Sequence, residues 1–107
     1  MATVRLNTRL IADWQSFHKI CRETFGFFDG YGENMNAWID CMSSLDEEGM
    51  TRFNLAKDEM LCVEIEATED FQTRLPEVFA EFVSCTAIVN QRYAEMVTNP
   101  ALALIFL

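Results

Sequence analysis

Few residues in this sequence are of the types that catalyse reactions, and they form no catalytic pattern. His18 is the single histidine, and it lies within a helical pattern with no nucleophile motif near it. The sequence contains no nucleophile elbow, no glycine loop that would hold a phosphate and no two-histidine metal motif. We therefore predict that the protein is not an enzyme and needs no cofactor, and that His18 is a surface or half-buried side chain.

The cysteines are the second group that could do chemistry. Cys21, Cys41, Cys62 and Cys85 are far apart in the sequence and include no CxxC pair, which a zinc site or a redox dithiol would need. All four stand among apolar or helical neighbours, so we expect buried free thiols rather than reactive ones. Free thiols are typical of a reducing compartment, which favours the cytoplasm.

A pair of glutamates is the last candidate. Glu64 and Glu66 are two positions apart in a strand pattern, so their side chains point the same way and could resemble a carboxylate pair or a metal site. A solvated strand face explains the same spacing more simply. We therefore predict no metal site.

The net charge indicates which partners the protein can have. The chain has 107 residues, enough for a single domain over residues 1–107, and its 17 acidic and 8 basic side chains give a net charge of −9. Such a charge repels phosphate backbones and anionic lipid, so we expect no nucleic acid and no membrane partner. Met1–Leu10 has no signal-peptide pattern, and no apolar run approaches the roughly 20 residues of a membrane span. A basic protein is the partner that this charge favours.

The elements that must position these residues follow from the hydrophobic periodicity. Alternating or apolar runs predict three strands, and apolar residues at steps of three and four predict three main helices. Asp13 and Asn34 are expected to cap the first two helices, and Gly26 to end the first. The expected strands are 3–7, 61–66 and 101–107, and the expected helices are 14–25, 35–45 and 76–98, with a helical turn at 70–75.

This order predicts an α/β fold, a small three-stranded parallel sheet packed with helices, because long right-handed crossovers must join the strands. Residues 101–107 are apolar on both faces, so we expect them to form a strand inside the sheet that is covered on each side. Alternation at Thr51–Leu55 predicts a short added strand or hairpin near residues 50–60.

The most informative segment is the glycine-rich aromatic loop Phe28–Gly32, which leads directly into the helix capped by Asn34. Asn36 and Asp40 lie four positions apart on one face of that helix. A solvated helix face would explain this pattern. The tyrosine beside glycines and carboxylates is equally typical of a recognition surface.

This segment resembles the barstar-like family of intracellular ribonuclease inhibitors. The resemblance rests on the string Tyr31–Asn34 followed by Ala37 and Asp40–Cys41, and the order of elements agrees over nearly the whole chain. Only residues 46–59 form a longer piece, whose role the sequence leaves open. The resemblance implies a three-stranded parallel α/β fold. It also implies inhibition by occlusion, in which the second helix and its loop enter a ribonuclease cleft and acidic side chains replace substrate phosphates.

The resemblance also implies which residues contact the partner. Asp40 matches the central aspartate of the family, and Glu81 matches a further glutamate on the last long helix. The full set of expected partner-binding residues is Asp29, Gly30, Tyr31, Gly32, Asn34, Asn36, Asp40, Ser44 and Glu81.

The sequence also departs from the family pattern. Asn36 replaces a second aspartate, Gly30 a tyrosine, and Ile39 and Leu45 two tryptophans. A partner arginine opposite Asn36 would lose a charge-assisted hydrogen bond. The leading hypothesis is therefore a cytoplasmic immunity protein that inhibits a secreted basic ribonuclease, although its target has diverged.

Two other hypotheses remain. The first is a barstar-like regulatory protein that docks on a non-nuclease partner. The second, an enzyme that uses Asp40 and Glu81 as a carboxylate pair, ranks last because no other residue supports it. We expect a monomer, with self-association through Met50, Phe53 and Leu55 left open.

Overall fold

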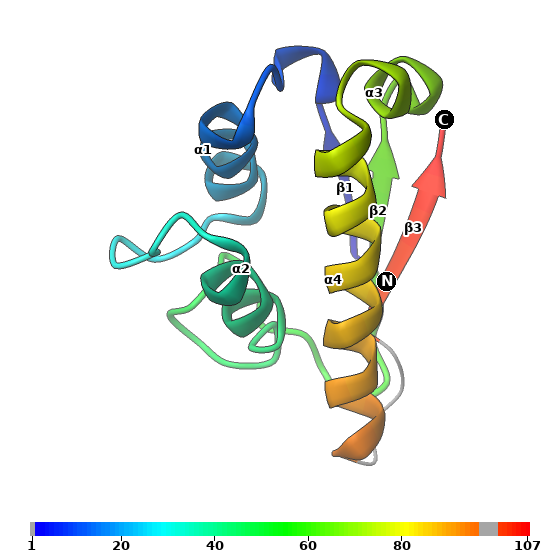
Figure 1. Ribbon diagram of the computed structural model, residues 1–107. Coiled ribbons are helices and arrows are strands. Elements are labelled where there is room, and N and C mark those ends of the chain that lie inside the picture. The colour runs from blue at the N-terminus through cyan, green and yellow to red at the C-terminus, as the bar shows by residue number, and fades with distance from the viewer. Residues whose placement is uncertain (1, 97–100) are drawn as a thin grey trace.

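The computed structural model describes residues 2–96 and 101–107 of the chain (Figure 1). Three strands, one short 3-10 helix and four α-helices alternate along the sequence. They are β1 (Ala2–Leu6), η1 (Thr8–Leu10), α1 (Trp14–Phe25), α2 (Met35–Met42), β2 (Leu61–Ile65), α3 (Thr68–Arg74), α4 (Pro76–Glu95) and β3 (Leu102–Phe106).

The three strands form one parallel sheet in the order β1-β2-β3, as the predicted α/β fold requires. Val4, Val63 and Leu104 stand side by side in its register. The α1–α2 pair connects β1 to β2, and the α3–α4 pair connects β2 to β3. In Figure 1, α4 runs beside the sheet and separates β3 from α1 and α2.

The helices cover one face of the sheet. Val4 and Leu6 of β1 and Val63 of β2 are buried in the core, whereas Thr3 and Arg5 of β1 point to the opposite face and are exposed. This alternation is what a one-sided strand pattern predicts. The second face of the sheet therefore remains open to solvent at these positions.

The residues predicted to begin and end α1 do so in the structure. The Asp13 carboxylate accepts a hydrogen bond from the Ser16 N–H (2.8 Å), and the Ser16 side chain reciprocates at the Asp13 N–H. Gly26 ends α1 in the left-handed conformation with φ 64°. A Cβ at Gly26 would lie 2.6 Å from the Arg52 Cβ, so both backbone geometry and space require glycine there.

The prediction for the last strand was wrong in its position. β3 is an edge strand, because β2 occupies the centre of the sheet. Ile105 is 40% exposed, and Phe106 and Leu107 are each 52% exposed. An apolar run shows that a strand is hydrophobic but not which neighbours it receives, since neighbours depend on how the crossovers return the chain. The long helix α4 ends at Glu95, and the stop predicted at Asn99–Pro100 lies outside the described residues.

The prediction of an added strand or hairpin near residues 50–60 was also wrong. The segment between α2 and β2 is irregular, with one isolated bridge between Glu48 and Thr51. It bonds instead to the end of α1 and to the turn after α2: the Arg52 N–H donates to the Phe25 carbonyl (3.0 Å), and the Leu55 N–H donates to the Leu45 carbonyl (2.8 Å). Its apolar residues are absorbed in this packing, because Leu55 is buried and Met50 and Phe53 pack against the core.

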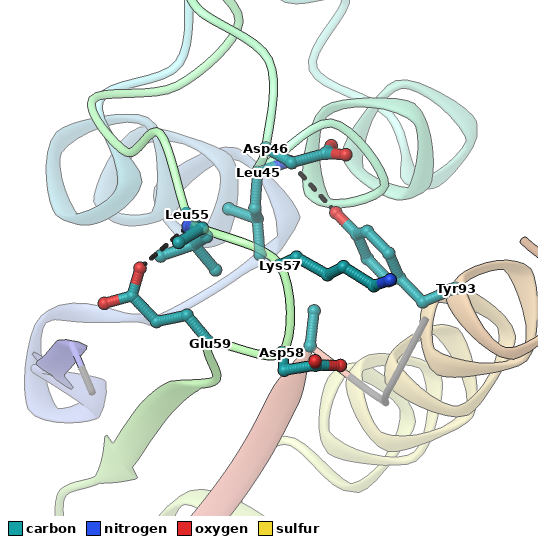
Figure 2. A pocket seen from close by; sticks show the side chains of 9 residues that line it. Leu45, Asp46, Leu55, Lys57, Asp58, Glu59 and Tyr93 are labelled. Carbon is teal, nitrogen blue, oxygen red and sulfur yellow. Dashed lines mark hydrogen bonds between the residues drawn. The ribbon is translucent and has the colours of Figure 1, made fainter. Parts of the chain in front are cut away.

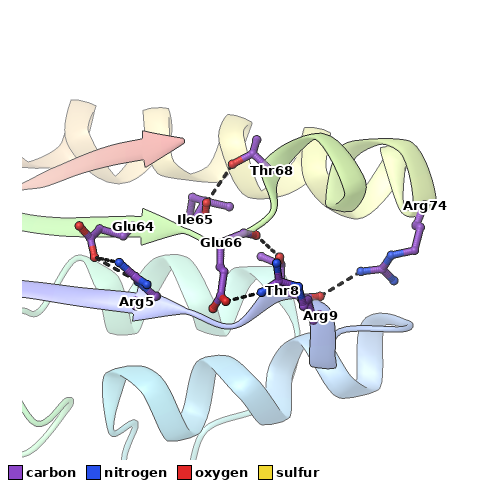
Figure 3. A network of polar contacts seen from close by, with 8 residues as sticks. All are labelled: Arg5, Thr8, Arg9, Glu64, Ile65, Glu66, Thr68 and Arg74. Carbon is purple, nitrogen blue, oxygen red and sulfur yellow. Dashed lines mark hydrogen bonds and ion pairs between the residues drawn. The ribbon is translucent and has the colours of Figure 1, made fainter. Parts of the chain in front are cut away.

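Polar contacts close the carboxyl end of the sheet (Figure 3). Arg5 pairs with Glu64 across the open face (3.2 Å), and Arg9 pairs with Glu66. The Arg74 guanidinium donates to the Thr8 carbonyl (3.0 Å). Each glutamate of the Glu64/Glu66 pair therefore has its own arginine, and the described residues contain no metal-binding group of histidine, cysteine or carboxylate side chains. Nor is any helix among them long and apolar enough to cross a membrane.

Candidate functional site

The loop before α2 is folded into a tight turn. The Tyr31 N–H donates to the Phe28 carbonyl (3.0 Å), and Gly30 lies inside this turn. A Cβ at Gly30 would lie 2.4 Å from the Phe28 ring. The glycine that replaces the family's tyrosine therefore suits a turn on which Phe28 is folded back.

Asn34 joins the loop to α2. Its side-chain oxygen accepts from the Ala37 N–H (2.8 Å), and its amide nitrogen donates to the Gly32 carbonyl (3.3 Å). Glu33, just before the cap, has a positive φ of 54°. Asn34 therefore satisfies the first turn of the helix and fixes the direction from which the loop enters it.

Tyr31, expected at the partner surface, has a buried side chain. It is only 4% exposed, and its hydroxyl lies 2.6 Å from Nδ1 of His18 on α1. The guanidinium of Arg22 lies 5.8 Å from the centre of the Tyr31 ring. Tyr31 thus holds the loop against α1, and the exposed loop positions are Phe28, Asp29, Gly30 and Gly32.

His18 is a structural residue of this loop anchor. It is 5% exposed and stacks on Trp14, with ring centres 5.9 Å apart. Burial lowers the pKa of His18, and the nearby Glu33 carboxylate partly opposes this effect. His18 is therefore neutral at pH 7, and its Nδ1 is committed to Tyr31.

The buried side of α2 packs on α4. Trp38 is fully buried, with its ring centre 5.8 Å from that of Phe82. Ile39 and Leu45, at the positions of the two family tryptophans, are also in the core, at 8% and 0% exposure. These residues fill space inside the protein, so neither position lies on the exposed side of α2.

The C-terminal end of α2 is fixed by Tyr93 of α4. The buried Tyr93 hydroxyl donates to the Met42 carbonyl (2.8 Å) and accepts from the Leu45 N–H (3.0 Å). Figure 2 shows this hydroxyl pointing at the backbone of Leu45, beside a hollow of about 30 Å³ that has room for one water molecule. α2 is therefore anchored at both ends, by Asn34 and by Tyr93.

Asp40 lies on the exposed side of α2 and already has a cationic partner. Its side chain is 66% exposed, and its carboxylate pairs with the Arg92 guanidinium of α4 at 3.0 Å. Arg92 also reaches the Ser43 hydroxyl (3.5 Å). Asn36, one turn before Asp40, is exposed, whereas the Ser44 hydroxyl donates to the Asp40 carbonyl (3.0 Å).

Glu81 lies on α4, on the same stripe as Arg92. Positions 81, 85, 88 and 92 follow one another at helical steps of four, three and four. Glu81 is exposed and accepts from the Cys85 thiol (3.9 Å), while Ile88, between Glu81 and Arg92, is 44% exposed. Glu81 and Arg92 are about 16 Å apart along the helix axis at 1.5 Å per residue.

These positions define one face, which we call the α2 surface. It consists of the exposed predicted residues of the loop and of α2, namely Asp29, Gly30, Gly32, Asn34, Asn36 and Asp40. Tyr31 supports this surface from within, and Ser44 is half-buried just beyond the C-terminal end of α2. The contacts of Arg92 and Tyr93 with the α2 segment were not predicted, because no local motif indicates that α4 contacts α2 at these two residues.

A wider groove adjoins the start of α2. This open groove has a volume of about 520 Å³ between α1 and the loop, and is lined by Trp14, Gln15, His18, Glu33, Asn34 and Met35. Trp14 is 36% exposed there. The groove extends the α2 surface with an apolar wall and one carboxylate.

Comparison with known proteins agrees with this geometry. The family model described as Barstar (barnase inhibitor) matches residues 1–104, nearly the whole chain. A search of the curated proteins gave no match. With its parallel three-stranded sheet and its capped, anchored second helix, this chain belongs to the barstar family.

Proposed function

We propose that this protein inhibits a basic ribonuclease by covering its active-site cleft with the α2 surface. The observation that carries the proposal is the exposed carboxylate of Asp40 on a helix anchored at both ends. A ribonuclease cleft holds a polyanion with cationic side chains, and a fixed carboxylate can take the place of a phosphate. The family description, a barnase inhibitor, supports the same action.

Rigidity supports this mechanism. Asn34 caps the first turn of α2, Trp38 is buried against α4, and Tyr93 holds the last carbonyl of the helix. A surface that is already ordered loses little conformational entropy on binding, so more of the contact energy appears as affinity. Asp40 is thus presented in one position instead of being ordered by the partner.

The net charge supports a fast encounter. A charge of −9 attracts a basic enzyme over long distances, and this attraction weakens as salt shortens the Debye length. The association rate constant should therefore fall as ionic strength rises, in a stopped-flow titration with the ribonuclease. A rate constant that does not respond to salt would argue against this mode of association.

Asn36 affects which ribonucleases the protein can bind tightly. A neutral amide on the exposed face of α2 replaces a carboxylate of the family pattern. Because a charge-assisted hydrogen bond is about twice as strong as a neutral one, a partner with arginine opposite Asn36 would be bound less tightly. The proposed target is a diverged secreted ribonuclease, and the proposed role is to protect the cytoplasm of the cell that makes it.

The decisive experiment is a ribonuclease assay with the partner recovered by pull-down from the native cell extract. Asp40→Ala should weaken inhibition by at least about 30-fold, the lower end of the loss for one partner of a buried charge pair. Asp46→Ala, Glu47→Ala and Glu48→Ala are matched controls that remove one exposed carboxylate each, and each should cost less than about fivefold. Equal losses at all four positions would contradict the proposal.

A second candidate function is regulation of a partner that is not a nuclease. It is favoured by Asn36, which leaves the α2 surface less acidic than the family pattern, and by Ile39 and Leu45, which stand where the family pattern has tryptophans. Recovery of a strong partner without ribonuclease activity in the same pull-down would support this function over inhibition.

A further inference from the structure

The outer edge of β3 is only partly covered. Asn90 of α4 lies against this edge at Leu102: its side-chain oxygen accepts from the Leu102 N–H (3.0 Å), and its amide nitrogen donates to the Leu102 carbonyl (3.0 Å). The Asn90 amide thus bonds to the first residue of β3 as a neighbouring strand would. Further along β3, no side chain plays this part among the described residues.

The ladder to β2 shows which backbone groups remain. The Ala101 carbonyl accepts from the Leu61 N–H (2.7 Å), and the Leu107 N–H donates to the Ile65 carbonyl (3.0 Å). Backbone groups of successive residues in a strand point to alternate sides, so the odd-numbered residues of this segment face β2 and the even-numbered ones face outward. Leu104 and Phe106 therefore direct their N–H and C=O groups away from the sheet.

The side chains around these groups are apolar and exposed. Ile105 is 40% exposed on the open face of the sheet, and Phe106 and Leu107 are 52% exposed. Leu102–Leu107 contains no charged residue, proline or glycine. Proteins usually protect a free edge with such residues, as β1 does with Arg5 at the other edge.

We propose that the free edge of β3 pairs antiparallel with β3 of a second copy of this chain. A twofold axis at Ile105 places Leu104 of each copy opposite Phe106 of the other. Each of these residues offers one donor and one acceptor, so four hydrogen bonds form and none of the outward groups is left over. The two sheets then join into one six-stranded sheet, with the two Ile105 side chains in contact on its open face.

The uncharged strand β3 allows a second copy to occupy this edge despite the net charge. Two chains of charge −9 repel each other, and β3 is a contiguous strand without charge through which they can meet. Half of a phenylalanine surface is about 100 Å², so Ile105, Phe106 and Leu107 offer roughly 300 Å² per copy. A stable interface buries about 1,200 Å² or more in total. The dimer is therefore weak, and it strengthens with salt because salt screens the repulsion.

This interface is separate from the α2 surface. In Figure 1, α4 lies between β3 and α2, so pairing through β3 leaves the α2 surface accessible. Salt should strengthen the dimer and slow the association with a basic partner. The two interactions can thus be distinguished in the same protein.

The test is sedimentation velocity of the full chain from about 10 μM to 1 mM, at low and at high salt. We expect a concentration-dependent shift from monomer to dimer that grows with salt. Ile105→Lys places two like charges face to face across the axis and should give a monomer throughout. The matched control Leu10→Lys changes a residue that is 59% exposed after β1, and should dimerise as the unmodified chain does.

Amide hydrogen exchange gives a second measurement that needs no variant. The N–H groups of Leu104 and Phe106 should become protected as the protein concentration rises. The proposal would be overturned by a monomer at 1 mM or by a dimer that persists in Ile105→Lys. It would also be overturned if the rate of hydrogen exchange at these two amides did not depend on protein concentration. Should Ile105→Lys fail to fold, the exchange measurement decides.

Discussion

The Asp40 carboxylate of α2 and the Arg92 guanidinium of α4 form an ion pair at 3.0 Å on the surface of the protein. Both side chains are exposed, at 66% and 47%, so the pair contributes little to folding. The ion pair instead affects how Asp40 can bind a partner. The carboxylate that would receive a cationic group of the partner is partly neutralised within its own chain, and a partner guanidinium must share or displace Arg92.

Replacing Arg92 should therefore strengthen binding. In Arg92→Gln the carboxylate of Asp40 is free, and we expect the recovered partner to bind about two- to fivefold more tightly, the range of a weak exposed ion pair. Arg5→Gln is a matched control, because it makes the same change in net charge but replaces an arginine that pairs with Glu64 on the open face of the sheet. Calorimetric titration of both variants checks the prediction, and equal gains would mean that net charge alone is responsible.

Tyr93 should be important for stability because it satisfies two backbone groups at the end of α2. Tyr93→Phe leaves the buried Leu45 N–H and Met42 carbonyl without this partner, and we expect the free energy of unfolding in urea to fall by about 1–3 kcal/mol. Thr86→Val is the control, since the Thr86 hydroxyl bonds to the Phe82 carbonyl within the same helix. A loss in Tyr93→Phe no greater than in the control would show that the anchor is dispensable.

Stability should fall in mild acid because of His18. Burial holds the pKa of His18 in the folded protein below 6.5, its ordinary value in the unfolded chain. Below pH 6.5 the unfolded chain therefore binds the proton first, and the folded state loses stability until the pH reaches the lowered pKa. Urea unfolding from pH 7.5 to 5 should show this decline, and His18→Asn should flatten it. A wild-type profile without slope in that window would contradict the assignment.

The thiols should be protected in the folded protein. All four cysteines are present as buried thiols outside any disulfide. Burial raises the pKa of Cys41 to about 11 and also raises that of Cys21, so few thiolates form at pH 8. A thiol-specific disulfide reagent should react slowly with the native protein and rapidly with all four thiols in urea. A fast phase in the native protein would reveal an accessible thiolate and contradict this expectation.

Local sequence determined much of the fold. Asp13 and Asn34 cap their helices and Gly26 ends α1, because each of these signals acts within a few residues of itself. The hydrophobic periodicity identified the three strands and the main helices for the same reason. The resemblance at Tyr31–Asp40 then pointed to the family, since the motif lies in one contiguous segment.

Contacts between distant segments decided the rest. Tyr31 stands in a loop that looks exposed, yet its hydroxyl finds His18 on another helix and its ring is buried. Asp40 carries no local sign that Arg92, on α4, will reach it. The edge position of β3 depends on how two crossovers arrange three strands, which no property of residues 101–107 records. The types of the site residues were thus readable in the sequence, whereas their exposure and pairing arose only when separate elements packed together.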